Sequence, residues 1–256
     1  MGIEKFRLDG RVALVTGSSQ GIGLAIARGL AQVGATVVVN GRTQAKVDAT
    51  VAQLRGEGLK AEAGAFDVTS AAAATEAIKA IESRVGPIRI LVNNAGIQRR
   101  GTLDTYEEAT WREIMTTNLD SIFFVSKPVA QSMIRNGKGG AIINICSVMS
   151  ELARPTTAPY AATKGGLKML TKGMATDWGK HGIRVNGIGP GYFKTELNDA
   201  LVKDQTFSGW VQGRTPLGRW GDTDELAGAA VFLASDAASF VTGHVLYVDG
   251  GMTACV

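Results

Sequence analysis

Two side chains of the sequence could move a proton together. Tyr160 and Lys164 stand four residues apart in a stretch with helical periodicity, so they are expected to share one face of a helix. A phenol with its ordinary pKa of about 10 is a poor acid or base at neutral pH, and a neighbouring ammonium favours the phenolate. Tyr–Lys pairs with this spacing are also common on solvated helices. Whether this pair is catalytic therefore depends on the residues around it.

Polar side chains follow two predicted strands. Ser147 comes just after the apolar run Ala141–Ile145, and the Asn93–Gly96 segment follows Ile90–Val92. The carboxyl ends of parallel strands form ligand crevices, so a hydroxyl at Ser147 could bind a substrate carbonyl beside the phenol. The alternative interpretations are an ordinary cap for Ser147 and a simple turn for Asn93–Gly96.

A glycine-rich turn follows the first predicted strand, Val12–Val15. Gly17, Gly21 and Gly23 precede and open an apolar helical pattern. Glycines there permit close approach of a pyrophosphate, and the helix N-terminus supplies N–H donors. The spacing differs from the common dinucleotide fingerprint, but a strand before it and a helix after it favour a nucleotide cradle over a structural turn.

The end of the second predicted strand, Thr36–Val39, indicates which nucleotide is bound. An NAD site usually offers an acid here to the ribose 2′-hydroxyl. This sequence has neutral Asn40 instead, and Arg42 could bind a 2′-phosphate through two hydrogen bonds. We therefore predict NADP(H) as the cofactor. The alternative is that Arg42 merely begins a solvated helix.

Apolar, β-branched runs alternate with helical patterns, which is typical of a doubly wound parallel sheet with helices on both faces. The predicted strands are Val12–Val15, Thr36–Val39, Ile90–Val92, Ala141–Ile145, Val185–Ile188 and Val245–Val248. The predicted helices are Ile22–Val33, Gln44–Arg55, Ala71–Arg84, Glu107–Ile134 and Ala158–Lys180. We predict a single α/β domain over residues 1–256, a Rossmann-type sheet of about seven strands, with a substrate lid at about 192–220.

Composition narrows the class of protein. The net charge of +4 comes from scattered Lys and Arg rather than a basic run, which argues against nucleic-acid binding. The two cysteines have no metal-ligand spacing, so no metal site is expected. No apolar stretch approaches the ~20 residues that span a bilayer, and the start lacks a signal-peptide core. We expect a cytoplasmic protein without a membrane partner.

Together these residues resemble the short-chain dehydrogenase/reductase family, from about Leu8 to Met252. The matching positions are Thr16–Gly23, Asp67, Asn93–Gly96, Asn118, Ser147, Tyr160, Lys164, Pro190, Gly191 and Thr195. The resemblance implies that Tyr160 is the general acid in reduction and the base in oxidation. It also implies that Lys164 binds the nicotinamide ribose, Ser147 orients the carbonyl, and Asn118 holds a proton-relay water.

The same resemblance extends the cofactor site. The expected cofactor-binding residues are Gly17, Ser19, Gln20, Gly21, Ile22, Gly23, Asn40, Arg42, Asp67, Val68, Asn94, Ala95, Gly96, Tyr160, Lys164, Pro190, Gly191, Phe193 and Thr195. In one departure, many NADP(H)-preferring relatives carry a basic residue at Gln20. The 2′-phosphate contact is therefore expected to depend largely on Arg42.

Strings outside the cofactor motifs resemble one branch of the family, which interconverts D-gluconate and 5-keto-D-gluconate. They are Asn93–Arg100, Asn144–Ser147, Ser150–Pro155, Gly189–Glu196, Arg214–Pro216 and Arg219–Gly221. Arg99, Arg100 and Arg154 follow strand ends, where a guanidinium could pair with a sugar-acid carboxylate. The expected substrate-binding residues are Arg99, Arg154, Ser147 and Tyr160. Surface or subunit contacts are the alternative for the arginines.

Two other functions remain open at this point. The chain could reduce other ketones or β-ketoacyl thioesters on the same fold, or it could be a catalytically silent nucleotide-binding scaffold. The intact set of Asn118, Ser147, Tyr160 and Lys164 argues against a scaffold. The resemblance further implies a homotetramer.

Overall fold

The computed structural model describes residues 2–255. Seven parallel strands form the main sheet in the order β3-β2-β1-β4-β5-β6-β9. Their bounds are β1 Val12–Val15, β2 Thr36–Val39, β3 Ala61–Ala63, β4 Ile88–Asn93, β5 Gly140–Ile145, β6 Ile183–Pro190 and β9 Val245–Val248. The predicted doubly wound sheet of about seven strands is confirmed.

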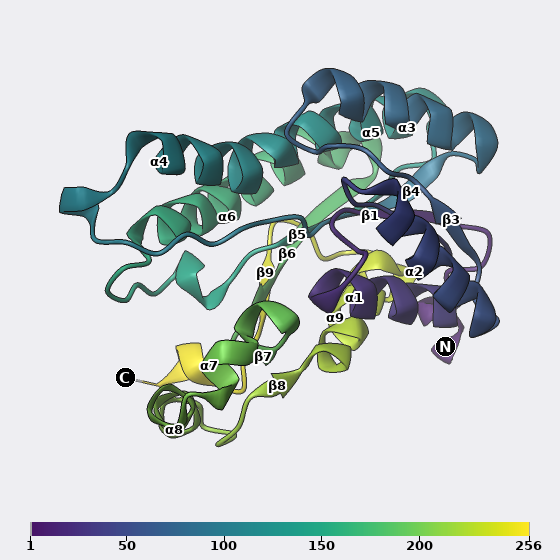
Figure 1. Cartoon of the computed structure of the whole chain (residues 1–256). Coiled ribbons are helices and arrows are strands. Elements are labelled where there is room, and N and C mark those ends of the chain that lie inside the picture. The colour runs from purple at the N-terminus through teal and green to yellow at the C-terminus, as the bar shows by residue number, and fades with distance from the viewer. Residues whose placement is uncertain (1, 256) are drawn as a thin grey trace.

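Helices cover both faces of the sheet (Figure 1). One face carries α1 Gly21–Gln32, α2 Gln44–Gly56 and α9 Ala227–Ala234. The other carries α3 Ala71–Arg84, α5 Ser121–Asn136 and α6 Ala158–Trp178, with α4 Glu108–Met115 packed on α6. Successive strand residues point to opposite faces, so Ala13 and Val15 belong to one apolar core and Leu14 to the other. Burial on both faces explains the unbroken apolar runs.

The strand order reverses direction between β1 and β4, which are neighbours in the sheet although β2 and β3 lie between them in sequence. At such a switch point the connections that follow the two strands diverge to opposite faces. A crevice forms at the carboxyl edge as a result. The glycine turn after β1 and the Asn94–Gly96 segment after β4 both enter this crevice.

The structure departs from the predicted elements at β3 and within the helix predicted for Glu107–Ile134. β3 was not predicted, because it is three residues long and has a half-buried Glu62 at its centre. The single helix predicted for Glu107–Ile134 is interrupted by a π-helical turn, Thr116–Asp120, between α4 and α5. The extra residue in that turn shifts the helix register, and Asn118 becomes fully buried. The periodicity of this stretch does not indicate the shift.

Residues 192–220, which we predict to act as a substrate lid and call the lid segment below, lie beside the main sheet (Figure 1). The lid segment contains β7 Phe193–Lys194, α7 Asp199–Lys203 and α8 Gln205–Arg214. β7 pairs in parallel with β8 Gly221–Asp222, so both ends of the segment are held together.

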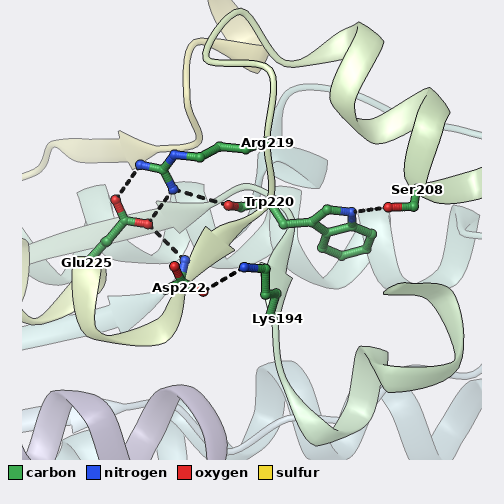
Figure 2. A network of polar contacts seen from close by, with 6 residues as sticks. All are labelled: Lys194, Ser208, Arg219, Trp220, Asp222 and Glu225. Carbon is green, nitrogen blue, oxygen red and sulfur yellow. Dashed lines mark hydrogen bonds and ion pairs between the residues drawn. The ribbon is translucent and has the colours of Figure 1, made fainter. Parts of the chain in front are cut away.

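Polar contacts reinforce this junction (Figure 2). Lys194 Nζ lies 3.0 Å from Asp222 Oδ1, and Trp220 Nε1 donates to Ser208 Oγ at 2.8 Å. Arg219 forms a two-bond ion pair with Glu225, and this pair together with a hydrogen bond from Asp222 N lowers the pKa of the Glu225 carboxyl to about 2. The base of the lid segment is therefore fixed even where its helices are exposed.

No helix within residues 2–255 is long and apolar enough to cross a bilayer.

Candidate active site

A cavity of about 480 Å³ opens at the carboxyl edge of the main sheet. Its walls come from the glycine turn after β1, from residues that follow β2, β3, β4, β5 and β6, from α4, and from the start of the lid segment. The predicted cofactor residues that line it are Gly17, Ser19, Gln20, Gly21, Ile22, Gly23, Asn40, Arg42, Asp67, Val68, Asn94, Ala95, Gly96, Tyr160, Lys164, Pro190, Gly191, Phe193 and Thr195. The structure brings this whole set together, and their individual contacts with a cofactor remain a prediction.

The glycine turn needs its glycines for close packing. Gly17 has a φ of +59°, and a Cβ there would lie 2.9 Å from Ala95 Cα. At Gly23 a Cβ would lie 2.4 Å from the Gly17 carbonyl oxygen and 2.5 Å from Asn94 Nδ2. The side chain of Gln20, the N-cap residue of α1, makes no capping hydrogen bond within residues 2–255. The first N–H groups of that helix are therefore available to an anion such as a pyrophosphate.

Asn40 connects the glycine turn to the sheet. The side chain is 1% exposed, and its Oδ1 accepts a hydrogen bond from Gly17 N at 3.2 Å. Its Nδ2 donates to the carbonyl oxygens of Gly64 and Phe66 at 3.0 and 3.2 Å. The amide is thus used within the fold, and its contribution to cofactor choice is the absence of an acid at this position. Ser18 is likewise buried and bonded to Val15 and Asn40.

Arg42 is the exposed cation at this end of the cavity. Its side chain forms no hydrogen bond or ion pair within residues 2–255, although its charge helps to lower the pKa of Asp67. The larger causes of that shift are the Thr69 N–H and hydroxyl, which donate to Asp67 Oδ1 at 2.9 and 2.7 Å. The half-buried Ser19 hydroxyl lies against Gly41, next to Arg42. A guanidinium and a hydroxyl are suitable partners for a phosphate monoester.

Tyr160 and Lys164 lie one turn apart near the start of α6. Lys164 is 5% exposed, and its Nζ lies 5.6 Å from the centroid of the Tyr160 ring. Nζ donates to the Ile145 carbonyl oxygen, at the end of β5, over 2.6 Å. Lys164 is therefore buried, and both residues line the cavity rather than a solvated helix face. The helical placement predicted from the four-residue spacing is confirmed.

Ser147 stands two residues beyond β5 and borders the same cavity. Its Oγ accepts a hydrogen bond from Met149 N at 3.1 Å, so it caps the short helix Val148–Ser150. A hydroxyl that accepts in this way still has its own proton to donate. Capping and carbonyl binding are therefore compatible, and the cap fixes the direction of the oxygen.

Asn118 lies behind the cavity wall. Its Oδ1 accepts a hydrogen bond from Ile97 N and its Nδ2 donates to the Ile97 carbonyl oxygen, both at 2.8 Å, with a longer contact to Thr163 Oγ1 at 3.4 Å. The side chain thus holds the loop that follows β4 against α6. The amide is occupied by these bonds, and the relay role implied for Asn118 remains a prediction.

The predicted substrate arginines differ in their surroundings. Arg99 forms a two-bond ion pair with Glu113, at 2.9 and 3.0 Å. Arg154 has no charged partner within residues 2–255; its guanidinium carbon lies 4.8 Å from the centroid of the Phe207 ring, and its Nε is buried without a hydrogen bond. Arg100 also lacks a hydrogen bond or ion pair in that range. All three arginines line the cavity.

Glu113 and Phe207 were not predicted to interact with these arginines. They lie on helices distant in sequence, and no local pattern indicates such contacts.

Cys146 is 2% exposed, and burial raises the pKa of its thiol to about 11, which supports packing over nucleophilic chemistry. Within residues 2–255 no three His, Cys, Asp or Glu side chains gather in a way that could hold a metal ion.

A doubly wound sheet with a glycine turn at a helix N-terminus, and a Tyr–Lys pair that lines the same crevice, defines a dinucleotide-binding oxidoreductase. The chain belongs to the short-chain dehydrogenase/reductase family. A family model described as enoyl-(acyl carrier protein) reductase matches residues 17–253.

Individual relatives are similar over nearly their whole length. Gluconate 5-dehydrogenase of Gluconobacter oxydans is 56% identical, covering 98% of this chain and 97% of the relative. The 5-keto-D-gluconate 5-reductase of Escherichia coli K12 is 49% identical, covering 99% of both. A crystal structure of gluconate 5-dehydrogenase from Burkholderia cenocepacia, in complex with NADP and tartrate, is 57% identical, covers 99% of each chain and gives a TM-score of 0.96.

The glycine turn gives the first testable prediction. Replacing Gly23 with alanine should weaken NADPH binding about 10- to 100-fold, because overpacking by a methyl group costs roughly 1–3 kcal/mol and here displaces the Gly17 carbonyl. Gly173→Ala in α6 is the matched control, because a Cβ there meets nothing within 4 Å. Fluorescence titration with NADPH measures both; wild-type affinity in Gly23→Ala would contradict the packing argument.

Proposed function

We propose that this chain interconverts D-gluconate and 5-keto-D-gluconate with NADP(H). The observation that carries the proposal is the distribution of charge in one cavity. Arg42 is an unpaired cation near the glycine turn, Lys164 is buried beside Tyr160, and Arg100 and Arg154 are unpaired cations near the lid segment. An anionic cofactor and an anionic substrate would meet at the Tyr160 phenol.

The cofactor end fits a 2′-phosphate. The α1 N-terminus and the glycine turn would accept the pyrophosphate, and the Ser19 hydroxyl lies against Gly41, the residue before Arg42. Asn40 places no carboxylate where it would repel the phosphate. The Burkholderia cenocepacia relative was crystallised with NADP, which supports this choice.

The protein's own part in the reaction concerns the proton. NADPH, when bound, supplies the hydride. Ser147 would donate a hydrogen bond to the C5 carbonyl oxygen, and Tyr160 would give that oxygen its proton in reduction and take it back in oxidation. Lys164, whose Nζ lies 5.6 Å from the centroid of the Tyr160 ring, would hold the cofactor ribose. Asn118 would support the relay through the loop that it holds at Ile97.

The substrate end fits a carboxylate. Burial lowers the pKa of Arg100, and the nearby charge of Arg154 lowers it further. The two loops are joined by a hydrogen bond from Gly101 N to the Thr156 carbonyl oxygen at 3.2 Å. An anion between these guanidinium groups would relieve their repulsion. Arg99 has Glu113 as its partner, so we assign the carboxylate to Arg154 with Arg100 and leave Arg99 a loop-stabilising role.

We also propose that residues 192–220 act as a substrate lid within a single catalytic domain of residues 1–256. In addition, we propose a homotetramer in the cytoplasm. Exposed apolar side chains support the assembly: Leu103, Phe123 and Met169 lie on or near α4, α5 and α6 and are 48–61% exposed, and Phe240, which precedes β9, is fully exposed. Such apolar surface is costly in water unless another subunit covers it.

Cofactor selectivity is the next prediction. Arg42→Ala should raise the KM for NADPH about 10- to 100-fold, because a hydrogen bond to a charged group contributes about 1.5–3 kcal/mol. The KM for NADH, which has no 2′-phosphate, should change less than about twofold by the same argument. Steady-state rates with both cofactors test this. Equal losses with NADPH and NADH would remove Arg42 from phosphate recognition.

The reaction itself is tested by NADPH consumption with a panel of 5-keto-D-gluconate, 2-keto-D-gluconate and an acetoacetyl thioester. We expect turnover of 5-keto-D-gluconate and loss of at least about 1,000-fold in Tyr160→Phe, with NADPH affinity nearly retained, because only the proton donor is missing. Turnover of the thioester alone would replace the proposed substrate with a β-ketoacyl group. Full activity in Tyr160→Phe would remove Tyr160 from the mechanism.

A further inference from the structure

The Arg154 guanidinium lies over aromatic rings of the lid segment. Arg154 belongs to the turn that precedes α6, whereas the rings come from α8. The guanidinium carbon is 4.8 Å from the Phe207 ring centroid and 6.0 Å from that of Trp210. Both distances are within the range in which a cation is attracted to the face of a ring. The contact therefore connects the catalytic wall of the cavity with the lid segment.

The rings are themselves held in place. Tyr192, Phe207, Trp210 and Trp220 form a cluster in which neighbouring ring centroids lie 5.5 to 6.2 Å apart. Trp220 is 3% exposed and donates to Ser208 on the same helix as Phe207 (Figure 2). The Phe207 ring that contacts Arg154 is thus packed against Trp210 and the buried Trp220.

A cation held by ring faces keeps its hydrogen-bond donors free. The N–H groups of a guanidinium lie in its plane, so contact with a ring face occupies none of them. Within residues 2–255 the Arg154 side chain forms no hydrogen bond, and the buried Nε has no partner at all. The turn that contains Arg154 and precedes α6 is also constrained. Its Thr156 has a φ of +69°, a left-handed conformation that is unfavourable for a branched residue. Arg154 is therefore a cation in contact with ring faces whose N–H donors are unused within residues 2–255.

We propose that Phe207 and Trp210 are positioning residues that hold Arg154 for the carboxylate of the substrate and thereby make the enzyme select anionic over neutral sugars. The inference rests on the proposed function and adds to it the cause of charge selectivity. The ring faces set the position of the guanidinium, and the guanidinium pairs with the carboxylate. A neutral sugar gains nothing from this arrangement.

The test compares two ketoses that differ in one group. L-Sorbose has the chain of 5-keto-D-gluconate with a hydroxymethyl group in place of the carboxylate. Phe207→Leu removes the ring face but keeps apolar bulk, and Phe207→Tyr retains the ring. We expect Phe207→Leu to lower the ratio of kcat/KM for 5-keto-D-gluconate to that for L-sorbose about tenfold, mostly through KM, with the ratio restored in Phe207→Tyr.

Other outcomes overturn the proposal. An equal loss on both ketoses in Phe207→Leu would mean that the ring only packs the lid segment, and an unchanged ratio would mean that it does not position Arg154. Where L-sorbose turnover is too slow to measure, calorimetry of L-tartrate binding to the NADPH-loaded protein replaces it. Phe207→Leu should weaken that binding about tenfold and Phe207→Tyr should not; equal affinities contradict the proposal.

Failure of the proposed function would be seen separately. Wild-type protein that does not turn over 5-keto-D-gluconate refutes the assigned reaction. The tartrate measurement would still report whether Phe207 positions a carboxylate-binding arginine.

Discussion

The buried ammonium of Lys164 is the constraint on which the site depends. A charged group at 5% exposure needs compensation, and within residues 2–255 its only hydrogen bond is to the Ile145 carbonyl oxygen. That bond connects α6 to the end of β5, while the Lys164 carbonyl accepts a hydrogen bond from Ser150 Oγ. Lysine has three N–H donors, so two of them remain for a ligand. The fold therefore holds Lys164 in position and leaves it partly unsatisfied.

The two ends of the cavity also carry cations that the fold leaves without a partner. Several cations elsewhere have carboxylate partners, as in Arg28 with Glu57 and Arg219 with Glu225. Arg42 and Arg154, by contrast, have none within residues 2–255, although both face the cavity. Unpaired cations that line one crevice favour a ligand with negative charge at both ends. The phosphates of a dinucleotide and the carboxylate of a sugar acid together would supply negative charge to both ends of the cavity.

The elements of the sheet could be predicted because their causes are local. The apolar run at β5 and the glycine spacing after β1 each follow from burial on two faces or from the space available near a helix N-terminus. The helix predicted for Ala71–Arg84 has the same first and last residues in the structure. Its start is fixed by the Ser70 cap, whose Oγ accepts a hydrogen bond from Ala73 N. These features require no knowledge of distant residues.

Features that depend on distant partners could not be predicted in the same way. The π-helical turn at Asn118 is stabilised by Ile97, from the loop after β4, and sequence periodicity shows only a continuous helix. Arg99 and Arg154 both follow strand ends and have the same chemistry, yet one meets Glu113 and the other meets Phe207. Which arginine stays free for a substrate is decided by tertiary packing alone.

Thermal unfolding of wild type and Lys164→Met, with and without saturating NADPH, tests the role of the buried ammonium most directly. Methionine keeps the apolar stem and removes the desolvation cost of the charge, so the variant should unfold without NADPH at the wild-type temperature or above it. The rise in Tm on adding NADPH should shrink markedly, because a binding donor is lost. A lower Tm without NADPH together with the full wild-type rise would contradict the account and make Lys164 a structural residue.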